Sequence, residues 1–288
     1  VDDFEAVHIL ATSDGGYLIT GHSDGRFGCV IKVDADGIIR ARRNLPEIGG
    51  GSTFPIVKMH SVEVGNSFFV IGNSPGYIYK LDNSDLTIQA ERSFGQSLLV
   101  GKNGLLSSGQ DGIIVGGRNV DTRTAAIRRF RTSDLSEDLN FRNRIDNIQN
   151  SNASNWGQEV IDIERATDGD IIFLGRISNF ESCNCGGELD DDIWYLRISS
   201  QGNLEVISNL GSDAHEIFID ATAIPGGGFT IIGRSCDANI NSCESIGPSG
   251  ADPESENDWF WEFDQFGMDL GGANLLFDSD PSNLNTDN

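Results

Sequence analysis

A short apolar run that follows a turn rich in Gly and Asp, and that ends in Gly, occurs five times along the chain. Runs of five to seven residues bounded by glycine have the length of β-strands, whereas a buried helix needs about ten residues or more. The starts of the runs lie about 45 to 58 residues apart, which is typical of four-stranded propeller blades with loop insertions. The five copies are 14–21, 66–72, 111–117, 168–175 and 226–233.

Each run has apolar neighbours that complete a four-stranded unit. One strand-like segment precedes it, as at 6–11, and another follows it, as at 29–33 and 193–198. A Gly-containing turn such as 34–37 or 199–202 then leads to a fourth strand. The pattern predicts an all-β fold, a β-propeller of five four-stranded blades with essentially no helix, in preference to a β-sandwich pair or a β-solenoid. The predicted propeller covers residues 1–277, with blades at 4–48, 53–95, 97–146, 156–212 and 215–277, and 278–288 forms a polar tail or linker.

Composition narrows the classes of protein that this chain can belong to. Hydrophobic residues make up 38% and Gly 35 of the 288 positions, which is too apolar for a disordered chain and too rich in Gly for a helical bundle. No apolar run approaches the roughly 20 residues that span a bilayer, so no direct membrane insertion is expected. Twenty Lys and Arg residues stand against 44 Asp and Glu residues, a net charge of −24, which excludes a general affinity for nucleic acid.

Two long loops of the predicted fourth and fifth blades, 177–192 and 235–258, carry eleven acidic residues and no Lys or Arg. They also hold Cys183, Cys185, Cys236 and Cys243, whose Cys-x-Cys and Cys-x6-Cys spacing lacks the paired pattern of a zinc ribbon. Disulfides that staple exposed loops in an oxidising compartment are the favoured interpretation, with three pairings open. Cys29 lies inside an apolar run and is expected to be a buried free thiol.

The same loops offer oxygen ligands that would suit calcium, although a solvated acidic loop explains them better because no EF-hand spacing is present. No other cofactor is expected. The weak calcium candidates are Asp190, Asp191, Asp192, Asp252, Glu254, Glu256 and Asp258. Four tryptophans would be able to stack on sugar rings, namely Trp156, Trp194, Trp259 and Trp261.

No catalytic constellation emerges from the sequence, so we do not expect an enzyme. The Gly-x-Ser-x-Gly match at 21–25 joins two predicted strands, whereas a nucleophile elbow requires a following helix. His8 and His60 fall in first strands and would converge near a central channel, although ordinary packing is the favoured interpretation. Seven arginines gather in the predicted third blade and favour internal salt bridges or an interface over a patch for anionic polymers; they are Arg118, Arg123, Arg128, Arg129, Arg131, Arg142 and Arg144.

The segments 14–21 and 30–40 together resemble the propeller repeats of secreted and surface-anchored bacterial proteins, which are common in Bacteroidota-type large exoproteins. In that family a Gly-Gly-Tyr strand is followed by an Ile-Lys-Leu-Asp strand and a Gly turn, and 192–198 of the fourth unit matches in part. The resemblance implies an extracellular or cell-surface location and an adhesive or structural role.

The functional expectation is therefore a non-catalytic extracellular module that acts by protein–protein contact in an adhesin, surface protein or appendage. The enlarged loops of the fourth and fifth units are its expected contact surface, for a protein partner or for self-association. A glycan-binding propeller is the alternative, and a propeller glycosidase with converging carboxylates comes third.

Overall fold

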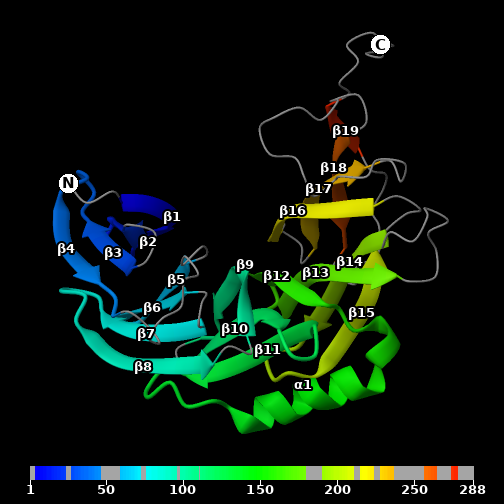
Figure 1. Ribbon diagram of the computed structural model, residues 1–288, viewed down its shortest axis with the longest axis horizontal. Coiled ribbons are helices and arrows are strands. Elements are labelled where there is room, and N and C mark those ends of the chain that lie inside the picture. Colours follow the sequence, from blue (N-terminus) through cyan, green and yellow to red (C-terminus); the bar gives the residue numbers. More distant parts are fainter. Residues whose placement is uncertain are drawn as a thin grey trace. The chain divides into compact units, whose positions relative to one another are not determined.

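The computed structural model describes residues 4–23, 27–46, 59–72, 76–95, 98–109, 111–179, 190–210, 215–223, 228–236, 256–264 and 274–277 (Figure 1). They belong to two compact units, Val1–Ser151 with Glu159–Ile163, and Asn152–Gln158 with Glu164–Asn288. Among the described residues, strands dominate in both units. The predicted all-β class is therefore confirmed at the level of antiparallel, mostly four-stranded sheets.

The first unit contains three antiparallel sheets formed by strands that follow one another in sequence. The strands of the first sheet are β1 (Phe4–Ala11), β2 (Tyr17–Ser23), β3 (Phe27–Val33) and β4 (Ile39–Asn44). Those of the second are β5 (Met59–Val64), β6 (Ser67–Gly72), β7 (Gly76–Asp82) and β8 (Ile88–Gly95). The third has β9 (Leu98–Ser107), β10 (Gly112–Asn119) and β11 (Thr124–Arg131), and β12 (Glu159–Arg165) meets β9 in a parallel bridge between Asp162 and Asn103.

The second unit repeats the antiparallel arrangement. It contains β13 (Ile171–Asn179), β14 (Asp190–Ile198) and β15 (Leu204–Leu210), followed by the sheet of β16 (His215–Ala223), β17 (Phe229–Cys236), β18 (Glu256–Phe263) and β19 (Asn274–Phe277). Tyr195, Phe229 and Phe263 stack between these two groups of strands, with ring centroids 4.7 and 4.9 Å apart. They form the core of this unit together with aliphatic residues such as Ile172 and Ile231.

The second sheet of the first unit is buried on both faces. Of four consecutive β6 residues, Phe68 and Val70 pack in the cluster shared with β2 and β3, whereas Phe69 and Ile71 pack in the cluster shared with β9, β10 and β11. This alternation follows from the pleat of a strand, which sends successive side chains to opposite faces. It explains why the apolar runs of the sequence are continuous instead of alternating with polar residues.

Among the hydrogen bonds between neighbouring sheets of the first unit, one made by an arginine of the fourth strand is repeated at both junctions. Arg43 Nε of β4 donates to the carbonyl oxygen of Leu86, and the guanidinium of Arg92 in β8 donates to that of Leu135, each at 3.1 Å. Both leucines are fully buried in the turn after the third strand of the next sheet, and both have positive φ, 61° and 58°. We call this contact the arginine–leucine latch. It satisfies carbonyl groups that burial would otherwise leave without a partner.

A helix replaces the fourth strand of the third sheet, so the expectation of an essentially helix-free chain is wrong at this point. After β11 and a single bridge between Phe130 and Glu137, the chain forms α1 (Leu139–Ser151). Asp138 caps this helix, because its Oδ1 accepts hydrogen bonds from the amides of Asn140 and Phe141, each at 3.1 Å. Phe141 and Ile145, one helical turn apart, are buried and give α1 its packed face, and α1 contacts β11.

We expect Arg43→Met and Arg92→Met each to lower the free energy of unfolding by about 1–3 kcal/mol. Both substitutions keep an apolar stem but leave the carbonyl of a buried leucine without its donor. Urea unfolding followed by fluorescence measures the effect. The matched control is Arg40→Met on the same β4 strand, where the side chain is 60% exposed and its ion pair with Asp34 is worth less than about 1 kcal/mol. Equal losses for Arg43→Met and Arg40→Met would show that the latch is not a structural contact.

Candidate functional site

The third strand of several sheets carries a cation at one register position. Lys32 pairs with Leu18, Arg129 with Ile114 and Arg197 with Ile172. In each case the cation pairs with a residue of the second strand. That residue lies two positions after the one whose carbonyl oxygen accepts the hydrogen bond of the turn between the first and second strands. The repeat therefore brings a basic side chain to the same place, beside the turn between the first and second strands.

In two of these sheets the turn supplies carboxylates that neutralise the cation. Lys32 Nζ lies 2.6 Å from Asp14 Oδ2 and also donates to the carbonyl oxygen of Asn83 at 2.7 Å. Arg197, whose side chain is 6% exposed, bonds to Asp168 and to Asp170. The hydrogen bond from Lys32, supported by one from the Thr12 hydroxyl, lowers the pKa of Asp14 to about 2. These cations are therefore structural.

The third sheet departs from this pattern. A neutral Gln110 stands at the sequence position that Asp14 and Asp168 occupy in the other two turns. Arg129 Nε donates instead to the Ser108 hydroxyl at 3.1 Å, and its nearest carboxylate in the described chain is that of Asp138, at the longer distance of 3.7 Å. The Arg129 side chain is 23% exposed, against 10% for Lys32. The basic group of the third sheet thus remains accessible from solvent.

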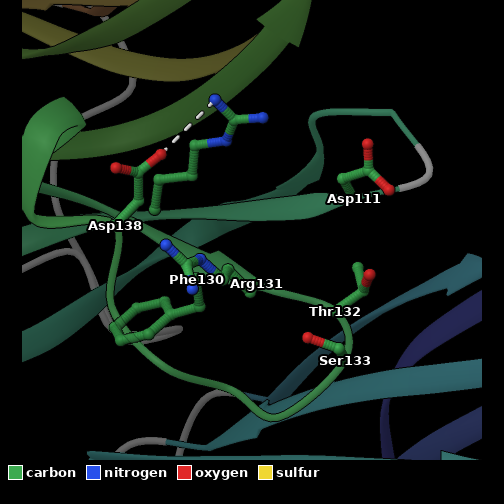
Figure 2. Close-up of a pocket in the computed structure, with 7 residues that line it drawn as sticks. Asp111, Phe130, Arg131, Thr132, Ser133 and Asp138 are labelled. Carbon is green, nitrogen blue, oxygen red and sulfur yellow. Dashed lines mark ion pairs between the residues drawn. The ribbon is translucent and has the colours of Figure 1, made fainter.

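An open pocket of about 310 Å³ lies where the pattern breaks. In the view of Figure 2, Asp138 and Asp111 border it on two sides, and Thr132 and Ser133 lie along the turn that follows β11. That turn is held in place because the Thr132 amide donates to the carbonyl oxygen of Asp111 at 3.1 Å. The full lining is Asp111, Arg129, Phe130, Arg131, Thr132, Ser133 and Asp138. Guanidinium groups, hydroxyls and carboxylates are thus presented together, which is a donor and acceptor set suited to a small polar ligand.

Two neighbouring arginines form internal ion pairs, which is one of the two roles expected from the sequence. Arg128 and Arg142 approach Glu137 at 4.0 and 3.6 Å, and Arg142 also lies 3.7 Å from Asp146 one helical turn further along α1. Arg131 differs, since it is an exposed residue that lines the pocket. The arginine-rich segment therefore divides into a structural part and a part that faces the pocket.

His8 and His60 converge in the structure. Their ring centroids are 4.0 Å apart between β1 and β5, and His8 Nδ1 lies 3.1 Å from the Ser61 hydroxyl. Burial, together with the neighbouring His8, lowers the pKa of His60 to about 3, and burial also lowers that of His8. His60 Nδ1 is buried without a hydrogen-bond partner among the described residues. A neutral, packed pair of histidines joins the first two sheets.

The structure removes two tryptophans from the set proposed for ligand stacking. Trp156 and Trp194 are 5% and 0% exposed, pack edge to face with centroids 5.1 Å apart, and Trp194 Nε1 donates to the carbonyl oxygen of Asn155. Their rings belong to the core, so the stacking prediction keeps Trp259 and Trp261, whose side chains lie outside the described part.

Most of the predicted loop sites lie outside the described residues. Cys183, Cys185, Cys243, Asp252 and Glu254 fall in the segments that the structure does not describe, as does the tail at 278–288. For Cys236 in β17, for Asp190, Asp191 and Asp192 at the start of β14, and for Glu256 and Asp258 in β18, only the backbone is described. Within the described ranges no group of three or more His, Cys, Asp or Glu side chains is placed to hold a metal ion. The disulfide and calcium hypotheses stay predictions, whereas Cys29 is confirmed as a buried free thiol.

The pocket is the feature that sequence reasoning missed. Aligning the third strands would have placed Arg129 with Lys32 and Arg197, and aligning the turns would have shown Gln110 in place of an aspartate. The contribution of Asp138 was hidden, because this residue enters the pocket only through the unexpected start of α1.

Comparison with known proteins places the chain by its fold. No family model and no curated protein matches the sequence. Among solved structures, a hydrazine synthase chain of Kuenenia stuttgartiensis is similar, with a TM-score of 0.60 and 12% identity over 94% of this chain and 66% of that chain, so this chain spans slightly less than two thirds of it. A luciferin-regenerating enzyme (TM-score 0.43, 12% identity, 94% and 81% coverage) and an α-L-arabinofuranosidase from Lactobacillus brevis (0.39, 11%, 92% and 92%) are less similar. At these identities only the hydrazine synthase likeness is informative, and it concerns the fold alone.

The described helix is too short and too polar to cross a membrane.

We expect the free energy of unfolding to decrease as the pH is lowered from 6.5 to about 4.5, because of the histidine pair. In the unfolded chain His60 takes up a proton near its ordinary pKa of 6.5, whereas in the folded protein it stays neutral down to a pKa of about 3. The unfolded state therefore binds more protons in this range. Each pH unit lowers the free energy of unfolding by at most about 1.4 kcal/mol per histidine. The pKa of Asp14 is about 2 and its ordinary value is 3.8, so this carboxylate contributes at lower pH.

Urea unfolding from pH 7 to about 4.5 measures this dependence. His60→Phe keeps an aromatic ring but cannot take up a proton, so the variant should show a flatter profile than the wild type. The control is His22→Phe, which removes a histidine beside Glu5 outside the stacked pair. A wild-type slope that His60→Phe leaves unchanged would contradict the assignment.

Proposed function

We propose that the chain is a non-catalytic β-propeller module that acts outside the cell by contact with other proteins, as part of an adhesin, a surface protein or an appendage. The observation that supports it best is the arginine–leucine latch, which occurs at both sheet-to-sheet junctions of the first unit. A contact repeated at successive junctions is typical of repeat proteins, in which each unit buries its faces against its neighbours. Five such units around one axis would give a rigid scaffold whose loops are available for binding.

The proposed contact surface is formed by the long acidic loops at 177–192 and 235–258, for which no counterpart of similar length exists in the first three repeats. The loop between β10 and β11, for comparison, holds only four residues, 120–123. Long acidic insertions add nothing that the first three sheets need in order to form. Their proposed role is therefore binding to a protein partner or to a second copy of the chain, with disulfides reducing the entropic cost of ordering them.

A glycan-binding module is the second candidate, and the pocket of the third sheet favours it. Its mixture of guanidinium groups, hydroxyls and carboxylates is able to donate to and accept from sugar hydroxyls. Hydrolysis of a glycoside by the protein would instead favour the glycosidase hypothesis.

Replacing 180–189 and 237–255 by short Gly-Ser turns should weaken self-association at least about tenfold while leaving the melting temperature within a few degrees of the wild-type value. Sedimentation velocity over a range of concentrations and thermal unfolding measure the two effects. The control variant lacks the tail 278–288, which is also polar and acidic and should leave both values unchanged. Association that survives loop replacement, or a wild-type chain that stays monomeric and captures no surface protein, would contradict the proposed contact surface.

A further inference from the structure

We propose that the pocket beside Arg129 and Arg131 binds a sugar that carries a carboxylate, that is, a uronic acid residue of an acidic glycan. This inference rests on the second candidate function, glycan binding, and names the ligand class and the residues for it. It does not involve the long acidic loops.

The first argument is the departure from the repeat. Where Lys32 and Arg197 are neutralised by turn aspartates, Arg129 has the hydroxyl of Ser108 and a carboxylate at 3.7 Å. A guanidinium that core stability does not require to be paired closely is able to form a short, charge-assisted hydrogen bond with a ligand anion. Because the pocket of about 310 Å³ lies beside this departure, we interpret it as a binding site.

The second argument is the local charge. Residues 111–144 contain seven Arg and five Asp or Glu residues, whereas the whole chain has a net charge of −24. Arg131 is exposed on the pocket lining, and Lys80 Nζ, which is 3.5 Å from the carbonyl oxygen of Ser133, brings a third cation close to the pocket. An anionic group would therefore be attracted to this place and repelled by most of the remaining surface.

The third argument separates a sugar acid from a simple anion. Asp111 and Asp138 also line the pocket, and their carboxylates would repel a doubly charged phosphate or sulfate. Carboxylates accept hydrogen bonds from hydroxyl groups, and the hydroxyls of Thr132 and Ser133 add donors and acceptors. A sugar with one carboxylate suits this lining, because its carboxylate would bind the arginines and its ring hydroxyls would bind the carboxylates and hydroxyls. The volume lies near the lower end of the roughly 300–1,000 Å³ that is usual for ligand pockets, which fits one sugar residue of a longer chain.

Isothermal titration calorimetry of the full chain with glucuronate, glucose, acetate and sulfate tests the proposal. We expect glucuronate to bind with a Kd of the order of 1 mM. Its affinity should be about tenfold or more higher than that of glucose, acetate or sulfate. Arg131→Gln should weaken glucuronate binding at least about tenfold, and Asp111→Asn should weaken it as well. Arg123→Gln, which removes the same charge from an exposed residue outside the pocket lining, should leave it unchanged.

Three results would overturn the proposal: no binding of glucuronate, binding of glucose or sulfate that equals it, or equal losses for Arg131→Gln and Arg123→Gln. Asp138 is left out of the test because it also caps α1, so its replacement would disturb the helix. If glucuronate fails to bind while loop replacement still abolishes association, the uronic acid site is refuted and the protein-contact function stands. If glucuronate binds and loop replacement has no effect on association, the glycan-binding function replaces the protein-contact function.

Discussion

The hydrogen bond from an outer-strand arginine to the carbonyl of a buried leucine fixes how one sheet of the first unit lies against the next. Leu86 and Leu135 adopt left-handed backbone conformations that cost a non-glycine residue about 1–2 kcal/mol. Burial of each leucine side chain returns about 1.5–3 kcal/mol, but only if the neighbouring sheet covers it. The same neighbour supplies the arginine that satisfies the leucine carbonyl. The turn and the stacking of the sheets are therefore stable together and not separately.

This dependence explains how a chain with a large excess of acidic residues, and with one α-helix in its described part, builds a packed core. Charged residues of the third strands reach turn carboxylates at the sheet ends, as Lys32 and Arg197 do, while most of the buried strand residues are apolar. The ion pairs described above are local to one sheet and stabilise its turns, whereas apolar contacts and hydrogen bonds such as the latch hold neighbouring sheets together. At Arg129 the carboxylate partner is Asp138 instead of a turn aspartate, at the longer distance of 3.7 Å, and the side chain is 23% exposed.

Sequence reasoning predicted the parts of the fold that rest on glycine and periodicity. The turns that contain Gly37 and Gly202 were expected from their sequence, and both glycines have positive φ, 78° and 82°. The corresponding turns at Leu86 and Leu135 gave no such signal, because leucine adopts this conformation only when a neighbouring sheet buries it. The helix α1 was missed for a related reason. Asp138 as an N-cap and Phe141 with Ile145 form too short an apolar pattern to outweigh a repeat that requires a strand there.

The candidate site was harder to predict than the fold. Its lining comes from the start of β10, the end of β11 and the cap of α1, which are adjacent only after the third sheet has formed. The tryptophans chosen from composition illustrate the converse error, since Trp194 is completely buried and serves packing. Residue type alone did not show that Trp156 and Trp194 belong to the core, whereas their burial in the folded structure did.

A crystal structure of the full chain tests the central claim, that the repeated units are the blades of one propeller. Our account predicts five sheets arranged around one axis, with the guanidinium of Arg43 on the carbonyl of Leu86 and that of Arg92 on the carbonyl of Leu135 at successive junctions. Sheets stacked in an open row, packed face to face as two layers, or joined without these two hydrogen bonds would contradict it.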